Sequence, residues 1–266
     1  MKVIVCSSYE ELSKKAAEIF AQRILQKPNI ILGLATGGTP VGTYKELIRL
    51  HNEHGLDFSQ VVTFNLDEYV GLAPSHPQSY RYFMDKNLFD AINIKKENTH
   101  ILSGTAEDVE AECASFEEKI ASAGGIDLQV LGIGSNGHIA FNEPGTSRDC
   151  RTHVVNLAES TIQDNARFFD DPSEIPRQAL TLGIGTIMEA REIILLASGQ
   201  GKAQAIARSV ERPITLAVPA SALQVHPNTV FIIDQDAASQ LKREYPQHSQ
   251  DLEMPSYATK IQPKVL

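Results

Sequence analysis

Short runs of valine, isoleucine and leucine alternate with longer segments of helical periodicity along most of this 266-residue sequence. Each run is apolar at consecutive positions and is bounded by polar residues, which is typical of a strand buried on both faces. The helical segments between such strands supply the crossover connections that parallel pairing requires. The alternation therefore predicts a doubly wound, Rossmann-like α/β fold, in which helices cover both faces of a mostly parallel sheet.

The element boundaries follow from the apolar runs and from helix-start signals such as Ser8 with Glu11 three residues later. The expected strands are Lys2–Val5, Ile30–Leu34, Val61–Asn65, His100–Leu102, Leu128–Ile133, Ile193–Ala197 and Val230–Ile233. The expected helices are Tyr9–Leu25, Val41–His51, Gln78–Phe89, Glu107–Ser122, Thr161–Phe168, Lys202–Ser209 and Ala237–Arg243.

No linker divides the chain, so residues 1–266 are expected to form one domain built on a single sheet. The polar stretch Arg167–Arg177 contains two prolines and interrupts the alternation. Polar excursions of this kind often cover binding sites, so we expect a lid segment over about residues 158–187.

The chain carries 24 lysines and arginines against 33 aspartates and glutamates, which gives a formal charge of −9. An acidic protein repels nucleic acids and anionic membranes, so we expect neither as a partner, and an anionic substrate needs a local positive pocket. No apolar stretch approaches the ~20 residues of a membrane helix, and the run Val3–Val5 stops at Ser7, as a first strand does and a signal peptide does not.

Three cysteines occur, without the spacing of a metal site. This number and spacing indicate reduced thiols, so we expect a cytoplasmic protein without a metal centre. Its expected ligand is a small molecule, and self-association stays open.

Two glycine-bearing loops follow expected strands, at the edge where open α/β sheets bind ligands. In Ala35–Pro40, two glycines and two threonines before a helix suit a cradle of N–H and hydroxyl donors for a phosphate. A tight turn that needs its glycines only for bending is the alternative. Lys202 follows Gly199 and Gly201 at a helix start, where a cation is unfavourable unless it holds an anion; a solvated surface lysine is the alternative.

Asp67 and Glu68 lie next to each other directly after the strand Val61–Asn65. Partial burial and a neighbouring like charge both raise the pKa of a carboxyl group. Such a group suits the abstraction of a carbon-bound proton. The alternative is a loop acid that only caps the next turn.

The segment Gly132–Gly137 has the glycine spacing of a dinucleotide-binding fingerprint. The third glycine of that fingerprint lies inside a helix, whereas Asn142–Gly145 here breaks any helix within two turns. The segment instead gathers Asn136, His138 and Glu143 around one bend, which suits a histidine acid/base oriented by polar neighbours.

The motifs LGLATGGTP, VTFNLDEYVGL, HPQSYRYFM and LGIGSNGHIAFNEPG resemble, in order and spacing, those of the glucosamine-6-phosphate deaminase family over nearly the whole chain. The resemblance implies conversion of glucosamine 6-phosphate and water to fructose 6-phosphate and ammonia, without cofactor or metal. It implies that Asp67 moves a proton from C2 toward C1 of the sugar and that His138 opens the ring, with Asn136 and Glu143 as its partners. The residues that it matches to phosphate binding are Thr36, Gly37, Gly38, Thr39, Arg167 and Lys202.

Two positions depart from the family pattern. Many members carry aspartate where this chain has Asn136. An asparagine can orient His138 but cannot stabilise an imidazolium by charge. Glu143 is therefore expected to contribute more than Asn136 as a partner of His138. Some members are activated by N-acetylglucosamine 6-phosphate through basic side chains shortly after the FNEP motif. The matching stretch Arg151–Val155 has histidine and valine where those cations fall, which predicts an enzyme without this activation.

Other functions remain open on these residues. A 6-phosphogluconolactonase or another sugar-phosphate isomerase would share the phosphate loop, although a lactonase needs no base at C2. A non-catalytic sugar-phosphate sensor would need only the TGGTP loop, Arg167 and Lys202. A nicotinamide dehydrogenase would use the glycine spacing of Gly132–Gly137.

Overall fold

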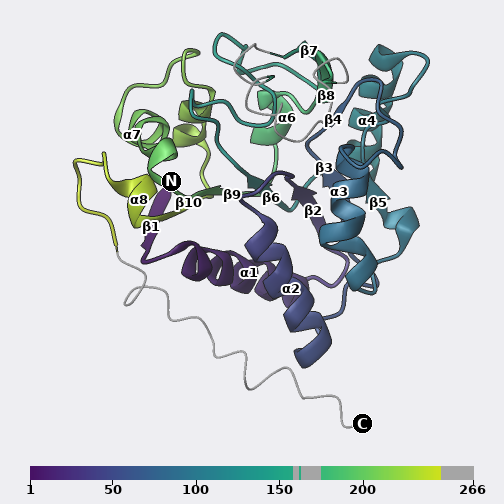
Figure 1. The fold of residues 1–266 in the computed structure, drawn as a ribbon, viewed down its shortest axis with the longest axis horizontal. Coiled ribbons are helices and arrows are strands. Elements are labelled where there is room, and N and C mark those ends of the chain that lie inside the picture. Colours follow the sequence, from purple (N-terminus) through teal and green to yellow (C-terminus); the bar gives the residue numbers. More distant parts are fainter. Residues whose placement is uncertain (158–161, 163–174, 247–266) are drawn as a thin grey trace.

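The computed structural model describes residues 1–157, 162 and 175–246, and a seven-stranded sheet forms its centre (Figure 1). The strand order is β1-β10-β9-β6-β2-β3-β5, and every neighbouring pair is parallel. In chain order the strands are β1 (Lys2–Cys6), β2 (Ile31–Leu34), β3 (Val62–Asn65), β5 (Thr99–His100), β6 (Leu128–Leu131), β9 (Glu192–Ala197) and β10 (Thr229–Asp234). The predicted parallel sheet is therefore confirmed.

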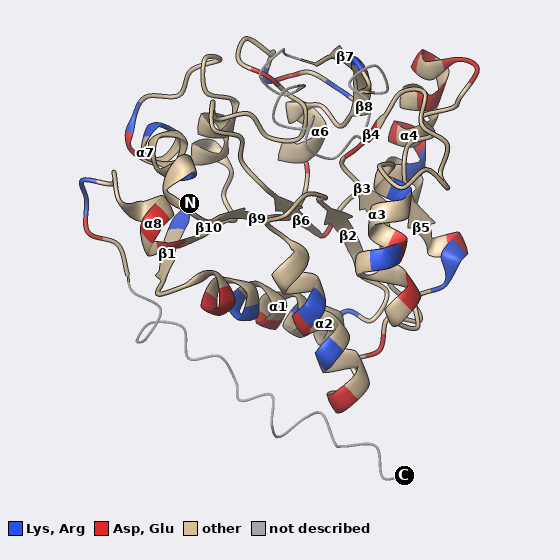
Figure 2. Ribbon diagram, viewed as in Figure 1, with Lys and Arg blue, Asp and Glu red and all other residues tan. Residues whose placement is uncertain are grey.

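The consecutive apolar positions in these strands are explained by burial on both faces. All four residues of β2 and of β6 are buried, as are the last five of β9. Lysine, arginine, aspartate and glutamate lie mostly on the surrounding helices and loops (Figure 2). The largest fully buried side chains of the core include Phe20, Phe64, Phe116 and Phe231.

Helices cover the sheet on both faces, with α1 and α2 on one side and α6 and α7 on the other (Figure 1). The α-helices are α1 (Tyr9–Gln26), α2 (Val41–His54), α3 (Tyr80–Asn87), α4 (Val109–Ala123), α6 (Ile184–Met188), α7 (Ala203–Glu211) and α8 (Gln235–Ala238). The 3₁₀ helices are η1 (Phe89–Ala91), η2 (Lys96–Asn98), η4 (Gln200–Lys202) and η5 (Pro219–Val225). Within the described ranges no helix has both the length and the apolar composition needed to cross a bilayer.

A second, three-stranded sheet was not expected. Its order is β4-β8-β7, with β4 (Asp67–Tyr69), β7 (His153–Asn156) and β8 (Gln178–Thr181), and both of its pairs are antiparallel. The expectation of a single sheet is thus wrong, because these strands are short and partly polar and pair residues far apart in the sequence. The sheet lies on the same side of the large sheet as α6 (Figure 1).

Three other expectations need comment. The last helix spans Gln235–Ala238 and not Ala237–Arg243. It begins earlier than expected because the Asp234 side chain caps it by accepting from the N–H of Ala237 at 2.8 Å. The helix expected at Thr161–Phe168 and most of the expected lid lie outside the described residues. Residues 178–187 of that lid are placed in β8 and α6, where most side chains are buried.

Candidate active site

The site lies at the point where the chain changes direction across the sheet. From β2 the chain continues through β3 to β5 on one side, and from β6 it continues through β9 to β10 on the other. Open α/β sheets bind ligands at the carboxyl ends of strands at such a switch point. The four loops singled out in the sequence follow β2, β3, β6 and β9, which are neighbours in the sheet.

A cavity of about 230 Å³ opens among these loops. It brings together most of the expected site residues, namely Thr36, Gly37, Gly38, Thr39, Asp67, His138 and Lys202. The rest of its lining is mainly apolar or glycine, and consists of Ala35, Leu66, Tyr80, Gly132, Ile133, Gly134, Ala140 and Phe141. Asn136 and Glu143 do not line it, and Arg167 lies outside the described residues.

The loop Ala35–Pro40 presents backbone donors. Gly37 has φ +84°, and an added Cβ would meet nothing within 4 Å, so backbone conformation and not space explains this glycine. The Tyr9 hydroxyl lies 3.1 and 3.0 Å from the carbonyl oxygens of Gly38 and Thr39. In the part of the chain that the structure describes, the N–H groups of residues 37–39 donate to no protein acceptor, which leaves them available to an anion.

Asp67 is the first residue of β4, and its Cα is paired with that of Thr181 in β8. Its side chain lies in the cavity although the residue is only 7% exposed. Burial, and to a smaller degree the charge of Glu68, raises the pKa of this carboxyl to about 8. No described residue donates a hydrogen bond to it, so it is free to meet a substrate.

Glu68 has a different role, because successive residues of a strand point to opposite faces. Its buried carboxylate accepts from the backbone N–H groups of Tyr69 at 2.9 Å, Tyr80 at 2.9 Å and Arg81 at 3.0 Å. The last two are the first N–H groups of α3, which lack a partner within the helix. The alternative of a capping acid is therefore correct for Glu68 and not for Asp67.

His138 rests on a glycine. A Cβ at Gly134 would lie 2.2 Å from Cε1 of the imidazole, so only glycine leaves room for the ring. The Gly134 N–H donates to the His138 carbonyl at 2.9 Å, and residues 132–145 form turns without a helix. The interpretation against a dinucleotide fingerprint is thus confirmed.

Glu143 is the ionisable neighbour of the ring, with its Oε1 3.5 Å from Nδ1 of His138. Asn136 does not contact the imidazole. Its Nδ2 donates to Glu143 Oε2 at 2.7 Å, and its Oδ1 accepts from the His138 backbone N–H at 3.1 Å. The asparagine thus holds the glutamate and the loop, while the glutamate faces the ring.

Lys202 ends η4 and lines the same cavity as the TGGTP loop. The preceding loop is fixed by Asp234, which accepts from the Gly199 N–H at 3.0 Å and from the Ser198 hydroxyl at 2.5 Å. Asp234 was not singled out in the sequence, although an acid at the end of a buried strand is a recognisable signal. Tyr80 was also not recognised as a lining residue. It lies in the motif HPQSYRYFM, to which no role was assigned from the sequence, and this motif was the signal that could have pointed to it.

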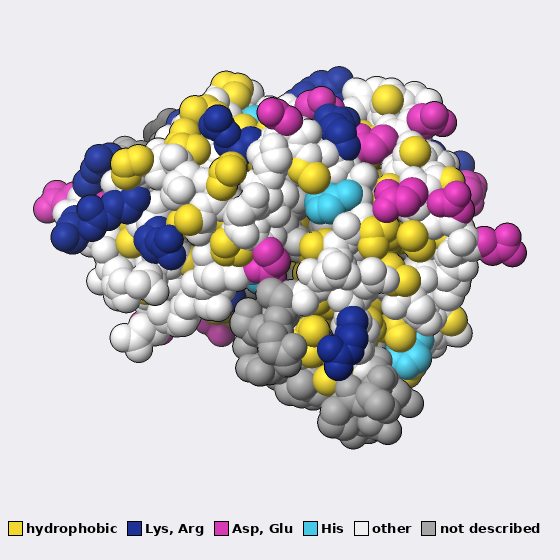
Figure 3. Space-filling view, turned by 90° about the horizontal axis from the view of Figure 1, so that it is seen from above, with side chains coloured by type: hydrophobic (Ala, Val, Ile, Leu, Met, Phe, Trp, Pro, Cys, Tyr) yellow, Lys and Arg dark blue, Asp and Glu magenta, His cyan; other side chains and the backbone are white. Residues whose placement is uncertain are grey.

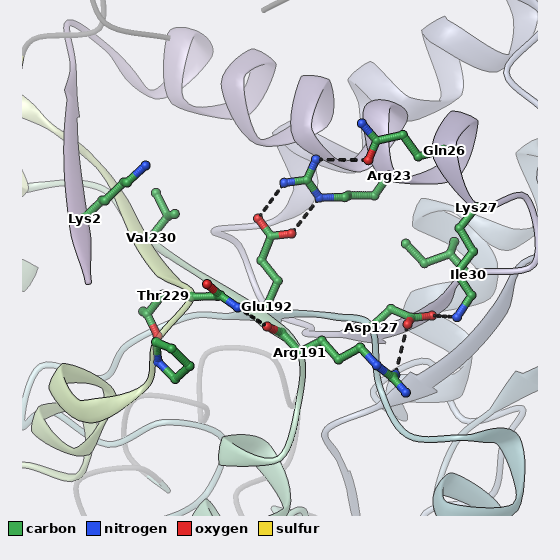
Figure 4. Close-up of a pocket in the computed structure, with 12 residues that line it drawn as sticks. Lys2, Arg23, Gln26, Lys27, Ile30, Asp127, Arg191, Glu192, Thr229 and Val230 are labelled. Atoms are coloured by element: carbon green, nitrogen blue, oxygen red, sulfur yellow. Dashed lines mark hydrogen bonds and ion pairs between the residues drawn. The ribbon is translucent and has the colours of Figure 1, made fainter.

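A larger cavity, of about 540 Å³, lies at the opposite edge, where β2, β6, β9 and β10 begin (Figure 4). Most of its charged side chains form ion pairs: Arg23 contacts Glu192 at 2.6 Å, and Asp127 contacts Lys27 at 2.6 Å and Arg191 at 3.0 Å. Asp127 also accepts from the Ile31 N–H at 2.9 Å. These contacts join the end of α1 to the strand starts, which is a structural role.

Charge is unevenly spread on the face drawn in Figure 3. Lysine and arginine gather at one end, over α7, and aspartate and glutamate at the other, over α4 (Figure 3).

Along residues 1–157, 162 and 175–246, no three His, Cys, Asp or Glu side chains come together as a metal-ligand set.

Known proteins of similar sequence identify the family of this chain. The family model described as "Glucosamine-6-phosphate isomerases/6-phosphogluconolactonase" matches residues 7–232. A glucosamine-6-phosphate deaminase of Thermoanaerobacter pseudethanolicus is 58% identical over 239 residues, which cover 90% of this chain and 94% of the relative. This chain belongs to the glucosamine-6-phosphate deaminase family. A deaminase of Clostridium perfringens (strain 13 / Type A) is 54% identical over 242 residues, which cover 91% of this chain and 100% of the relative.

Solved structures extend the family relationship. A monomeric glucosamine-6-phosphate deaminase superposes with a TM-score of 0.89 at 50% identity, covering 90% of this chain and 100% of the other. The 6-phosphogluconolactonase of Trypanosoma brucei gives a TM-score of 0.71 at 25% identity, covering 90% and 98%. The deaminase family thus shares its fold with lactonases.

Proposed function

We propose that this chain is a glucosamine-6-phosphate deaminase, which converts glucosamine 6-phosphate and water to fructose 6-phosphate and ammonia. The observation that carries the proposal is Asp67, a buried carboxyl without a hydrogen-bond donor and with a pKa raised to about 8 by burial. Such a group is partly ionised near neutral pH and basic enough to take a proton from carbon. It shares its cavity with the phosphate loop.

Ring opening falls to His138. A neutral imidazole can take the proton of the anomeric hydroxyl and return it to the ring oxygen. Glu143, 3.5 Å from Nδ1, orients the ring and stabilises its protonated form, and Asn136 holds Glu143 in place.

Asp67 then acts on the open-chain sugar. It takes the C2 proton while a proton of the substrate's ammonium group moves to the aldehyde oxygen at C1, which gives an enolamine. It then returns its proton to C1, so that C2 becomes a protonated imine carbon. Water adds at C2 and ammonia leaves, which yields the ketose phosphate.

The phosphate is held far from C2. The N–H groups of residues 37–39, the hydroxyls of Thr36 and Thr39 and the Lys202 ammonium supply donors and positive charge, and Arg167 is proposed to add a further cation. Binding energy spent on this remote group positions C2 against Asp67.

The lactonase and sensor alternatives are less well supported. A lactonase or a sensor has no use for an unpartnered base beside C2, and the lactonase of Trypanosoma brucei is 25% identical where the two deaminases above are 54% and 58% identical. We propose that the ligand of this site is a small sugar phosphate and that the protein works in the cytoplasm.

Activation by a second sugar phosphate is not proposed. The Arg151 guanidinium, the cation of the stretch Arg151–Val155, contacts Glu189 at 2.6 Å and Glu117 at 2.5 Å. With both carboxylates paired to it, this side chain is not free for a phosphate. Sigmoidal kinetics relieved by N-acetylglucosamine 6-phosphate would contradict this proposal.

A coupled assay for ammonium and fructose 6-phosphate tests the function. We expect wild-type protein to release both products in equal amounts, and Asp67→Asn to lose about 10³-fold or more in kcat while glucosamine 6-phosphate still binds. The matched control is Asp236→Asn, an exposed acid in α8, which we expect to retain full activity. Wild-type protein that hydrolyses 6-phosphogluconolactone and releases no ammonium would refute the proposal.

A further inference from the structure

The motif HPQSYRYFM has no role in the mechanism above, yet it places one side chain in the cavity. Ser79 caps α3 by accepting from the Tyr82 N–H, and Tyr80 is the first residue of the helix and lines the cavity. The backbone of Tyr80 is fixed from the catalytic strand, because Glu68, the neighbour of Asp67, accepts its N–H at 2.9 Å. The position of Tyr80 is therefore tied to that of Asp67.

The ring of Tyr80 is held by two aromatic neighbours. It stacks on Phe141 with a ring-centroid distance of 6.2 Å and an interplanar angle of 11°. It packs against Tyr69 at 4.8 Å. Tyr69 and Phe141 also contact each other, with ring centroids 5.7 Å apart, so the three rings form one cluster. This cluster restricts the Tyr80 ring and therefore the position of its hydroxyl.

The hydroxyl of Tyr80 joins the two halves of the site. It donates to the Tyr69 hydroxyl at 3.2 Å. Burial raises the pKa of the Tyr80 hydroxyl, and a hydrogen bond from the Thr36 side chain of the phosphate loop opposes this shift. Tyr69 lies two residues after Asp67 in β4, on the same face of the strand. The chain Thr36–Tyr80–Tyr69 thus runs from the phosphate loop to the strand that carries the base.

We propose that Tyr80 is a positioning residue of the deamination: its hydroxyl sets the separation between the phosphate loop and Asp67. The inference rests on the proposed function, and it adds a residue that touches neither C1 nor C2. A substrate held at one end by its phosphate needs this separation fixed, since a misplacement of about 1 Å can cost 10²-fold in rate.

The hydroxyl chain can also respond to the substrate. Hydroxyl protons rotate, and a phosphate oxygen can only accept. When Thr36 donates to the phosphate, Tyr80 donates to Thr36 and Tyr69 donates to Tyr80, so all three hydroxyls point toward the anion and strengthen one another.

The test is the variant Tyr80→Phe, which removes one oxygen and keeps the ring stack. We expect kcat for ammonium release to fall about tenfold, as for one lost hydrogen bond, while the inhibition constant of inorganic phosphate stays within about twofold. Tyr69→Phe should lower kcat in the same direction, and the double variant should be no slower than Tyr80→Phe, because both remove the same chain. The matched control is Tyr82→Phe, in the same helix with its ring beside Lys86, which should keep full activity.

Three outcomes overturn the inference. These are an unchanged kcat in Tyr80→Phe, a phosphate inhibition constant that rises in step with KM, and additive losses in the double variant. A wild-type protein without ammonium release overturns the proposed function and the inference with it, whereas an active wild type with an unaffected Tyr80→Phe overturns the inference alone. Equal unfolding midpoints for Tyr80→Phe and Tyr82→Phe keep a folding defect from imitating the expected result.

Discussion

The two cavities at opposite edges of the sheet differ in how their charged groups are satisfied. The cavity at the strand starts is the larger, about 540 Å³ against about 230 Å³, but its carboxylates Asp127 and Glu192 lie in ion pairs. At the strand ends, Asp67 has no hydrogen-bond donor among the described residues, and Nδ1 of His138 is buried without a hydrogen bond. Ionisable groups that make no hydrogen bond to the protein, and not the size of the cavity, distinguish the strand-end cavity from the other one.

The largest expected effect is that of pH on Asp67. Its pKa is about 8 in the fold against about 3.9 in an unfolded chain, so the folded state binds the proton more tightly. This stability is full below pH 4 and is lost as the pH rises to 8. Against Asp67→Asn, which does not titrate, wild-type protein should lose on the order of 3–5 kcal/mol of unfolding free energy over this range.

Denaturant titrations at pH 4, 6 and 8 measure this difference. The same pKa should appear as the acidic limb of kcat/KM for the wild type, with activity rising toward pH 8 because only the ionised carboxylate takes a proton. A wild type and an Asp67→Asn variant whose stabilities run parallel in pH would show that Asp67 is solvated and paired like the acids at the other edge.

The next effect concerns Glu143, which faces the imidazole. In Glu143→Gln the side-chain oxygen can still accept from Asn136, but the amide nitrogen then faces Nδ1 of His138 and favours the wrong tautomer. We expect kcat to fall about 10²-fold, or roughly 2.7 kcal/mol, with little change in the melting temperature. Steady-state kinetics of ammonium release measures it.

Asn136→Asp is the companion to that variant. It puts a second carboxyl beside Glu143, where the two side chains now lie 2.7 Å apart, and should move the acidic limb of the pH–rate profile. An unchanged profile would mean that Asn136 only holds the loop and does not tune His138.

The smallest effect is expected at the strand starts. Asp127→Ala removes an acceptor from the Ile31 N–H and from two half-exposed cations, and should cost about 1–2 kcal/mol of unfolding free energy. Because these groups satisfy one another and do not face the substrate cavity, kcat and KM should stay at wild-type values. A tenfold loss of kcat in a folded variant would end the distinction between the two cavities.

Sequence reasoning reached the parallel sheet because strands buried on both faces are continuous apolar runs. It could not reach β4, whose residues Asp67–Tyr69 are recognised as a strand only through pairing with β8, more than a hundred positions away. For the same reason the acid pair was treated as one feature, although the strand sends Asp67 into the cavity and Glu68 to α3. The contact of Asn136 with Glu143, and not with the imidazole, likewise depends on side-chain geometry that spacing does not encode.

The order of strands in the large sheet has a consequence for how the chain is made. β1 (Lys2–Cys6) pairs only with β10 (Thr229–Asp234), so β1 leaves the ribosome long before its partner strand. Until β10 pairs with it, the apolar residues and unpaired backbone groups of β1 are exposed. Exposed strands of this kind promote unwanted association with other nascent chains. Lys202 follows β9, which pairs with β10, so enzymatic activity requires these strands to be assembled and should report their pairing during refolding.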